Sequence, residues 1–284
     1  MSNQISEDFK IVAHKKKNSK IKQLHVRQSP EESIVTSITD KEKQQKRIVD
    51  AKSEISTSDF QESILASLQE ALTALDRPKL SKIVCFGLGK FTDNLSARYQ
   101  LALLLCLKDF YQVSVCAYDP CFSENEIDLL RHFEIIVLEE NMEGKYKVEP
   151  GEYVLFYLPH CSRQLSNNLL WSNWGLSLCQ CIIIANSFHE IIERSTVKTL
   201  KENAEYVSKI MPYVLEVAVI NSFKFYEVFN DTAVHVFPKL PFVPPDLWLQ
   251  NKEPKYSEND IECVTTGVSN LRMKNNVSYE QGLF

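Results

Sequence analysis

The chain has 284 residues, of which 44% are hydrophobic and 10% aromatic, so it can bury a packed core and is not disordered throughout. Its charge is unevenly distributed. Residues 1–57 carry 12 basic and 8 acidic side chains, whereas the remainder carries 20 basic and 29 acidic ones. An acidic domain repels a phosphate backbone, so nucleic acid is not an expected partner of the folded part. A small phosphorylated ligand held by backbone amides stays compatible with this charge.

The first 30 residues are polar and rich in lysine and contain no apolar signal-peptide core. The longest apolar run, Leu101–Leu107, is far shorter than the ~20 residues that span a bilayer. We therefore expect no membrane association and a cytoplasmic protein. The basic group His14–Lys17, with Lys20 and Lys22, is open to two interpretations: a patch for nuclear localisation or an anionic partner, or a solvated tail.

The eight cysteines include no Cys-x-x-Cys pair, and Cys179-Gln-Cys181 comes closest. Cys85, Cys116 and Cys181 lie in apolar strand-like runs, where a free cysteine behaves as a small hydrophobe. This pattern predicts reduced structural thiols and no metal site.

Three segments are expected along the chain. Residues 1–57 lack periodicity and are predicted to form a disordered basic tail. Order is predicted to begin at Ser58, which can cap a helix with Gln61 three positions on. The domain is expected to span residues 58–240, and the proline-led, polar residues 241–284 to form an extension.

Within the domain, short apolar runs alternate with helical patterns. The predicted strands are Ile83–Phe86, Val113–Tyr118, Ile135–Leu138, Tyr153–Tyr157 and Cys181–Ile184, and the predicted helices are Thr92–Lys108, Ser123–His132, Arg163–Trp171 and Glu190–Glu202. Continuous apolar strands between helices are typical of a parallel sheet covered on both faces. Tyr213–Ile220 and Ala233–Phe237 are joined too closely for a crossover helix and suit a terminal antiparallel pair. We predict an α/β, Rossmann-like three-layer sandwich, in the element order of class I methyltransferases.

Gly87 and Gly89 follow the first predicted strand and open the first helix, in a chain with only seven glycines. Such a turn lets the backbone approach a phosphate at a helix N-terminus, and Asp119 stands where Rossmann folds hold a ribose. These three residues are candidates for binding S-adenosylmethionine or another nucleotide. Two alternatives stay open: a tight turn without a ligand, and an Asp119 that caps the next helix.

His160, Cys161 and Asn186 follow the fourth and fifth predicted strands, where open α/β sheets place residues that contact ligands. His160 and Asn186 are weak catalytic candidates, as a general base and a substrate contact. A nucleophilic Cys161 activated by His160 is disfavoured, because adjacent side chains rarely point together. Asn230–Thr232 and His235 are explained by a turn before a strand.

Asparagines and tryptophans gather in one unusual stretch. Tryptophan rings need burial and amides need hydrogen-bond partners, so the stretch is either a ligand or partner surface or a wedge between helix and sheet. The residues concerned are Asn167, Asn168, Trp171, Asn173 and Trp174.

At these positions the sequence resembles the sensitivity-to-red-light-reduced (SRR1-like) family. The resemblance covers roughly residues 82–238. The strings that carry it are Phe86-Gly87-Leu88-Gly89, Tyr118-Asp119-Pro120, Phe156-Tyr157-Leu158-Pro159-His160-Cys161, Asn167-Asn168-Leu169-Leu170-Trp171-Ser172-Asn173-Trp174, Asn186-Ser187-Phe188 and Phe229-Asn230-Asp231-Thr232.

The resemblance implies a regulatory protein, since plant members act in light input to the circadian clock and animal relatives are linked to haem biosynthesis and clock-gene expression. It carries over no catalytic residue. Haem itself is not an expected ligand, because the Cys-Pro dipeptide of haem-regulatory motifs is reversed at Pro120-Cys121.

Two further functions are weighed against a regulator that binds a small molecule or a protein partner. The first is an S-adenosylmethionine-dependent methyltransferase that uses Gly87, Gly89 and Asp119. The second is a nicotinamide-dependent oxidoreductase, disfavoured because Thr92 replaces the third glycine of the dinucleotide motif.

Overall fold

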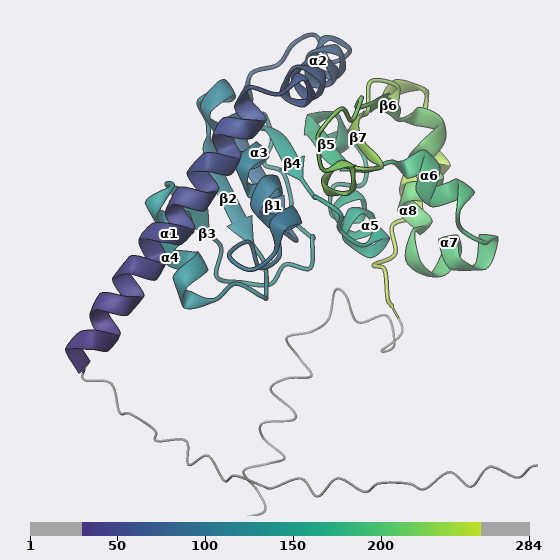
Figure 1. The fold of residues 1–284 in the computed structure, drawn as a ribbon. Coiled ribbons are helices and arrows are strands. Elements are labelled where there is room, and N and C mark those ends of the chain that lie inside the picture. Colours follow the sequence, from purple (N-terminus) through teal and green to yellow (C-terminus); the bar gives the residue numbers. More distant parts are fainter. Residues whose placement is uncertain (1–29, 257–284) are drawn as a thin grey trace, which may run out of the picture. The chain divides into compact units, whose positions relative to one another are not determined.

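The computed structural model of the chain describes residues 30–256, and the side chains of residues 40–256. It contains a seven-stranded sheet with helices packed on both faces (Figure 1). The strands are β1 (Leu80–Phe86), β2 (Ser114–Tyr118), β3 (Ile135–Val137), β4 (Tyr153–Tyr157), β5 (Cys181–Asn186), β6 (Leu215–Ala218) and β7 (Thr232–Val236). The longer helices are α1 (Pro30–Ser56), α2 (Asp59–Thr73), α3 (Leu95–Tyr111), α4 (Glu124–His132) and α5 (Arg163–Ser172). The shorter ones are α6 (Phe188–Glu193), α7 (Val197–Asn203), α8 (Glu205–Ile210) and α9 (Pro245–Leu249), together with the 3₁₀ turns η1 (Leu176–Gln180), η2 (Met211–Tyr213), η3 (Tyr226–Val228) and η4 (Leu240–Phe242).

The strands lie in the order β3-β2-β1-β4-β5-β7-β6. The first five strands of this order are parallel to one another, and β7 is antiparallel to both β5 and β6. The predicted mostly parallel sheet with a C-terminal antiparallel pair is therefore confirmed. Successive side chains of a strand face opposite sides, so each strand supplies both layers of the core.

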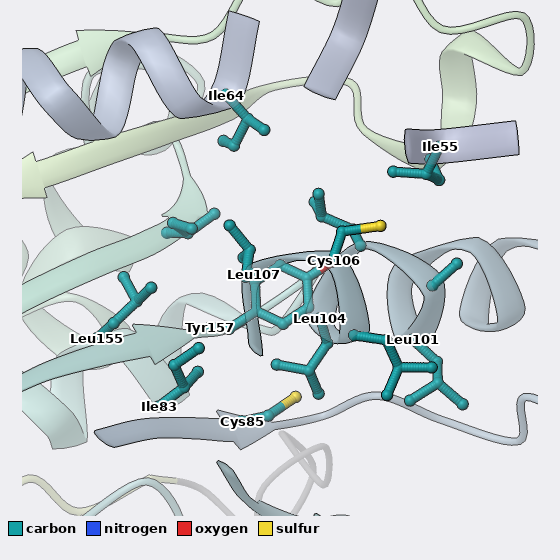
Figure 2. Close-up of a cluster of buried hydrophobic side chains, with 14 of the residues drawn as sticks. Ile55, Ile64, Ile83, Cys85, Leu101, Leu104, Cys106, Leu107, Leu155 and Tyr157 are labelled. Atoms are coloured by element: carbon teal, nitrogen blue, oxygen red, sulfur yellow. The ribbon is translucent and has the colours of Figure 1, made fainter. Parts of the chain in front are cut away.

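One layer joins α1, α2 and α3 to the sheet. Figure 2 shows Ile83 and Cys85 of β1 and Tyr157 of β4 in one cluster with Leu104 of α3 and Ile64 of α2. The other layer packs α5, α6 and α8 against the alternate positions of the same strands, including Val84, Phe156 and Ile183. β4, most of β5 and the second half of β1 (residues 83–86) are continuous apolar runs, as expected of strands covered on both faces.

The N-terminal segment differs from its prediction. Residues 1–57 were expected to be disordered, whereas α1 runs from Pro30 to Ser56 and its residues from Asp40 onward belong to the same unit as the sheet. Ile48, Ala51 and Ile55 are buried at spacings of three and four residues, which forms a narrow apolar stripe in a polar helix. So thin a stripe is easily missed in a sequence. The basic group around His14 lies outside the described residues.

Smaller differences concern helix ends. α3 begins at Leu95 rather than Thr92, and the helix predicted over Glu190–Glu202 is divided into α6 and α7. The described part of the predicted extension packs on the domain, since the Trp248 ring lies 5.1 Å from that of Trp174. Among the helices of the described residues, none has the length and hydrophobicity needed to cross a membrane.

Candidate functional site

The strand-end site consists of Gly87, Gly89, Asp119, His160 and Asn186, which follow or end β1, β2, β4 and β5. Parallel strands place their carboxyl ends at one edge of the sheet, so these residues were expected to lie together. One hydrogen bond joins two of these residues, and a second joins Asn186 to the residue that follows His160. The Gly89 N–H donates to Asp119 Oδ2 at 2.7 Å, and Asn186 Nδ2 donates to the Cys161 carbonyl at 3.0 Å.

Asp119 closes the glycine turn. Besides the Gly89 N–H, its carboxylate accepts the backbone N–H of Cys121 at 2.8 Å. The helix that follows is capped by Ser123, whose hydroxyl and the Glu126 carboxylate form a reciprocal capping box. The alternative that Asp119 caps this helix is therefore wrong.

Gly87 is required by the close approach of a side chain. Its φ is +71°, and a Cβ at this position would lie 2.4 Å from Cys161 Sγ. Cys161 Sγ also lies 3.1 Å from the Phe86 carbonyl oxygen. The space beside this glycine is therefore filled by the protein itself.

A buried carboxylate of α4 lies against the segment between the glycine turn and α3. Glu126, only 1% exposed, accepts hydrogen bonds from the Thr92 N–H at 3.1 Å and the Thr92 hydroxyl at 3.0 Å. It also accepts from the Ser123 N–H and hydroxyl. A nicotinamide dinucleotide needs this backbone for its pyrophosphate, and a carboxylate here repels it.

His160 and Cys161 have different partners. The His160 backbone has a φ of +50°, and its Nε2 lies 2.9 Å from the Val228 carbonyl oxygen, whereas the Cys161 thiol faces Phe86. The two side chains thus serve separate contacts. Among the described residues, no group of three or more His, Cys, Asp or Glu side chains could hold a metal ion.

The three asparagines of the Asn/Trp stretch are internal anchors. Asn168 Nδ2 donates to the Glu143 carbonyl at 2.8 Å, and Asn173 Oδ1 accepts the Val148 N–H at 2.9 Å, so both hold the loop before β4. Asn167 Oδ1 accepts the Tyr206 N–H at 2.7 Å. All three are at most 2% exposed.

The two tryptophans are half-buried. Trp174 Nε1 donates to the Leu247 carbonyl at 3.1 Å, and its ring contacts Tyr206 and Trp248 edge-on. Trp171 Nε1 is buried and has no hydrogen-bond partner in the described part of the chain. Trp174 thus joins α8 to the C-terminal segment.

The sequence pointed to His235 but not to the polar cluster that this side chain forms with Ser187 and Glu216. His235 is fully buried on β7, with Nδ1 3.1 Å from the Ile183 carbonyl oxygen and Nε2 3.0 Å from Glu216 Oε2. The Ser187 hydroxyl donates to Glu216 Oε1 at 2.6 Å. The backbone N–H groups of Phe188 and His189 donate to the same carboxylate.

Burial raises the pKa of Glu216, but the hydrogen bond and charge of His235, the Ser187 hydroxyl and the His189 N–H outweigh it and lower the pKa to about 2. The cluster has the residue types of a hydrolase triad, yet the hydroxyl donates to the carboxylate and not to the ring. It therefore connects β5, β6 and β7 and does not form a nucleophile. Only the register of β6 beside β7, which pairs Glu216 with His235, reveals it.

A sequence model of the SRR1 domain matches residues 56–236. An SRR1-like protein of Drosophila melanogaster is 31% identical over 96% of this chain and 99% of its own length. An SRR1-like protein of Mus musculus is 45% identical over 45% of this chain, and the match spans about half (53%) of that relative. The Protein SENSITIVITY TO RED LIGHT REDUCED 1 of Arabidopsis thaliana is 25% identical over 55% of this chain and 58% of its own length.

No solved structure matches the chain. The domain match covers well over half of the sequence, and the Drosophila relative aligns along nearly all of it. The chain therefore belongs to the SRR1 domain family.

Proposed function

We propose that this protein is a regulator that acts in circadian clock input and in the control of haem biosynthesis, by binding a small molecule or a protein partner at the strand-end site. The Arabidopsis relative is named for reduced sensitivity to red light, which supports a signalling role. We propose a cytoplasmic protein that can also enter the nucleus.

The observation that carries this proposal is the internal hydrogen bonding of the strand-end site. Asp119 holds the Gly89 and Cys121 N–H groups, and Asn186 holds the Cys161 carbonyl. A general base must reach a substrate proton, and a cofactor site needs free donors. Side chains engaged in fixing loops instead favour a rigid surface that is recognised by a partner or a ligand.

The proposal is tested by rescue in cells that lack the gene. We expect the wild-type chain to restore clock-gene rhythm and haem content. Asp119→Asn, which removes the charge that fixes the glycine turn, should fail to restore them at equal protein abundance. Asp246→Asn, the same change at an exposed acid of α9, is the matched control. Full rescue by Asp119→Asn would show that the strand-end site is not needed.

A methyltransferase is the second candidate, because the strand order with β7 alone reversed is that of class I methyltransferases. A shared fold does not give a shared function. Calorimetric titration of the purified chain with S-adenosylmethionine, NAD and haemin separates the two. Binding of S-adenosylmethionine that Asp119→Asn abolishes would favour the methyltransferase. If none of the three compounds gives heat, the regulator is the proposal that remains.

A further inference from the structure

A cavity of about 680 Å³ lies away from the strand-end site, between α7, the start of α8 and the segment 252–255. Figure 1 shows this segment, in yellow, running beside α8. Cavities that hold small ligands fall in the range of about 300–1,000 Å³, so its size suits a nucleotide. Its lining residues are Asn167, Lys198, Lys201, Glu202, Asn203, Glu205, Lys252, Glu253, Pro254 and Lys255.

The charges of this basic cavity do not cancel. Two of its three glutamates are paired with lysines outside the lining: Glu205 with Lys209 at 2.7 Å, and Glu253 with Lys145 at 2.8 Å. The third, Glu202, lies 3.9 Å from Lys198.

Three lysines of the lining are left over. Within the described part of the chain, Lys201, Lys252 and Lys255 form no ion pair with a carboxylate. The whole chain has a net charge of −5, so this local excess of positive charge is opposite in sign to the net charge of the chain. A cavity wall with unpaired ammonium groups attracts anions.

A buried amide also lines the cavity. Asn203 is 9% exposed, and its Oδ1 accepts a hydrogen bond from Gln164 Nε2 at 3.3 Å. Among the described residues, Gln164 is the hydrogen-bond partner found for this side chain, and it binds the oxygen. Because the bond to Gln164 fixes the oxygen on one side, the amide leaves its two N–H donors for an acceptor in the cavity.

The cavity wall is held in place by the Asn/Trp stretch. The Tyr256 hydroxyl donates to Asn168 Oδ1 at 2.7 Å and accepts from Asn167 Nδ2 at 3.0 Å. The Tyr206 hydroxyl donates to the Lys252 carbonyl at 2.6 Å. These bonds fix both ends of the segment that carries Lys252 and Lys255, so the lysines are presented by an anchored backbone.

We propose that this basic cavity binds a small organic phosphate of nucleotide size. A phosphate group offers several strong acceptor oxygens, which match the three unpaired ammonium groups and the amide donors of Asn203. A compact anion avoids the repulsion that the acidic chain exerts on an extended polyanion. The site is separate from the strand-end site and gives the asparagines at positions 167 and 168 a role in building it.

Isothermal titration of the full chain with ATP, inorganic pyrophosphate and adenosine tests the proposal at low and at physiological salt. We expect ATP and pyrophosphate to bind, more weakly as salt rises, and adenosine to give no heat. Lys201→Gln and Lys252→Gln should each weaken ATP binding about tenfold, the effect of losing one charged hydrogen bond. Asn203→Asp, which keeps the shape and adds a negative charge, should weaken it further.

Lys147→Gln is the matched control, because this lysine is exposed and lies outside the lining. The substituted lysines are exposed as well, so melting temperatures without ligand should not change. The proposal is overturned if neither phosphate probe binds at millimolar concentration, or if the cavity variants bind as the Lys147→Gln control does. Binding lost in Asp119→Asn but kept in the cavity variants would move the phosphate to the strand-end site and equally overturn it.

Discussion

Gly87 and Cys161 share one small space at the end of β1. The glycine has a φ of +71°, which an L side chain tolerates poorly, and the thiol stands where a Cβ would lie. Asn186 fixes the carbonyl of the same cysteine. The need for glycine at position 87 is therefore explained at the level of single residues by the packing of the β4–α5 loop against the turn.

We expect Gly87→Ala to lower the free energy of unfolding by about 2–5 kcal/mol, the sum of a left-handed backbone and an overpacked contact. In a Cys161→Ala background the contact is relieved, so the cost should fall to about 1–2 kcal/mol. Urea denaturation of the four proteins of this double-mutant cycle measures the difference.

Gly89→Ala is the control for backbone strain alone. Its φ is +73°, but an added Cβ would meet only Ala97 Cβ, at 3.8 Å. Its cost should therefore be independent of Cys161. Equal costs of Gly87→Ala with and without the cysteine would show that the thiol does not shape the turn.

At the scale of elements, α1 is part of the folded domain. Residues 48, 51 and 55 of this helix are buried, and Glu54 pairs with Lys224 at 2.7 Å. α1 thus contacts a segment 170 residues later in the chain, between β6 and β7. Tertiary contacts stabilise a helix whose own sequence is polar.

Ile55→Ala should lower the free energy of unfolding by about 2–5 kcal/mol, because its side chain is fully buried. Val49→Ala on the same helix is the matched control, since Val49 is 47% exposed, and should change stability by no more than about 0.5 kcal/mol. Chemical denaturation of both variants measures the difference. Equal stability of the two variants would show that the packing of α1 does not contribute to the free energy of unfolding.

At the scale of the whole molecule, the Glu216–His235 pair joins the antiparallel end of the sheet to β5. The pair is well shielded, with 0% of the His235 side chain and 17% of the Glu216 side chain exposed. Removing one partner of such a pair leaves a buried charge without compensation. The pair thus couples the stability of the sheet to pH.

The pKa of Glu216 falls from 4.5 to about 2 on folding, so this group stabilises the fold above pH 4.5 and loses that contribution as the pH falls towards 2. We expect Glu216→Gln to be less stable than the wild type by about 3 kcal/mol at pH 7. The gap should close between pH 4.5 and about 2. Urea midpoints of both proteins across this range give the measurement, and parallel pH profiles would contradict the pairing.

The strands and a mostly parallel sheet could be predicted, because continuous apolar runs such as β4 and β5 are recognisable without their neighbours. The contact of Asp119 with the glycine turn was predictable as well, because both follow parallel strands, which end at the same edge of the sheet. The partners of the asparagines were not. Asn167 and Asn168 bond to Tyr256, almost 90 residues away, and no local pattern encodes such a contact.

The amino-acid sequence by itself determined the family, the mostly parallel sheet and the approach of Asp119 to the glycine turn, because these depend on periodicity and on motifs that are local in the chain. Only the tertiary structure decided that α1 is folded, that Glu126 stands beside the turn, and that Glu216 meets His235. It also decided which lysines of the basic cavity are unpaired. The physical reason is that burial and charge compensation depend on the distance between atoms, which only the folded chain defines.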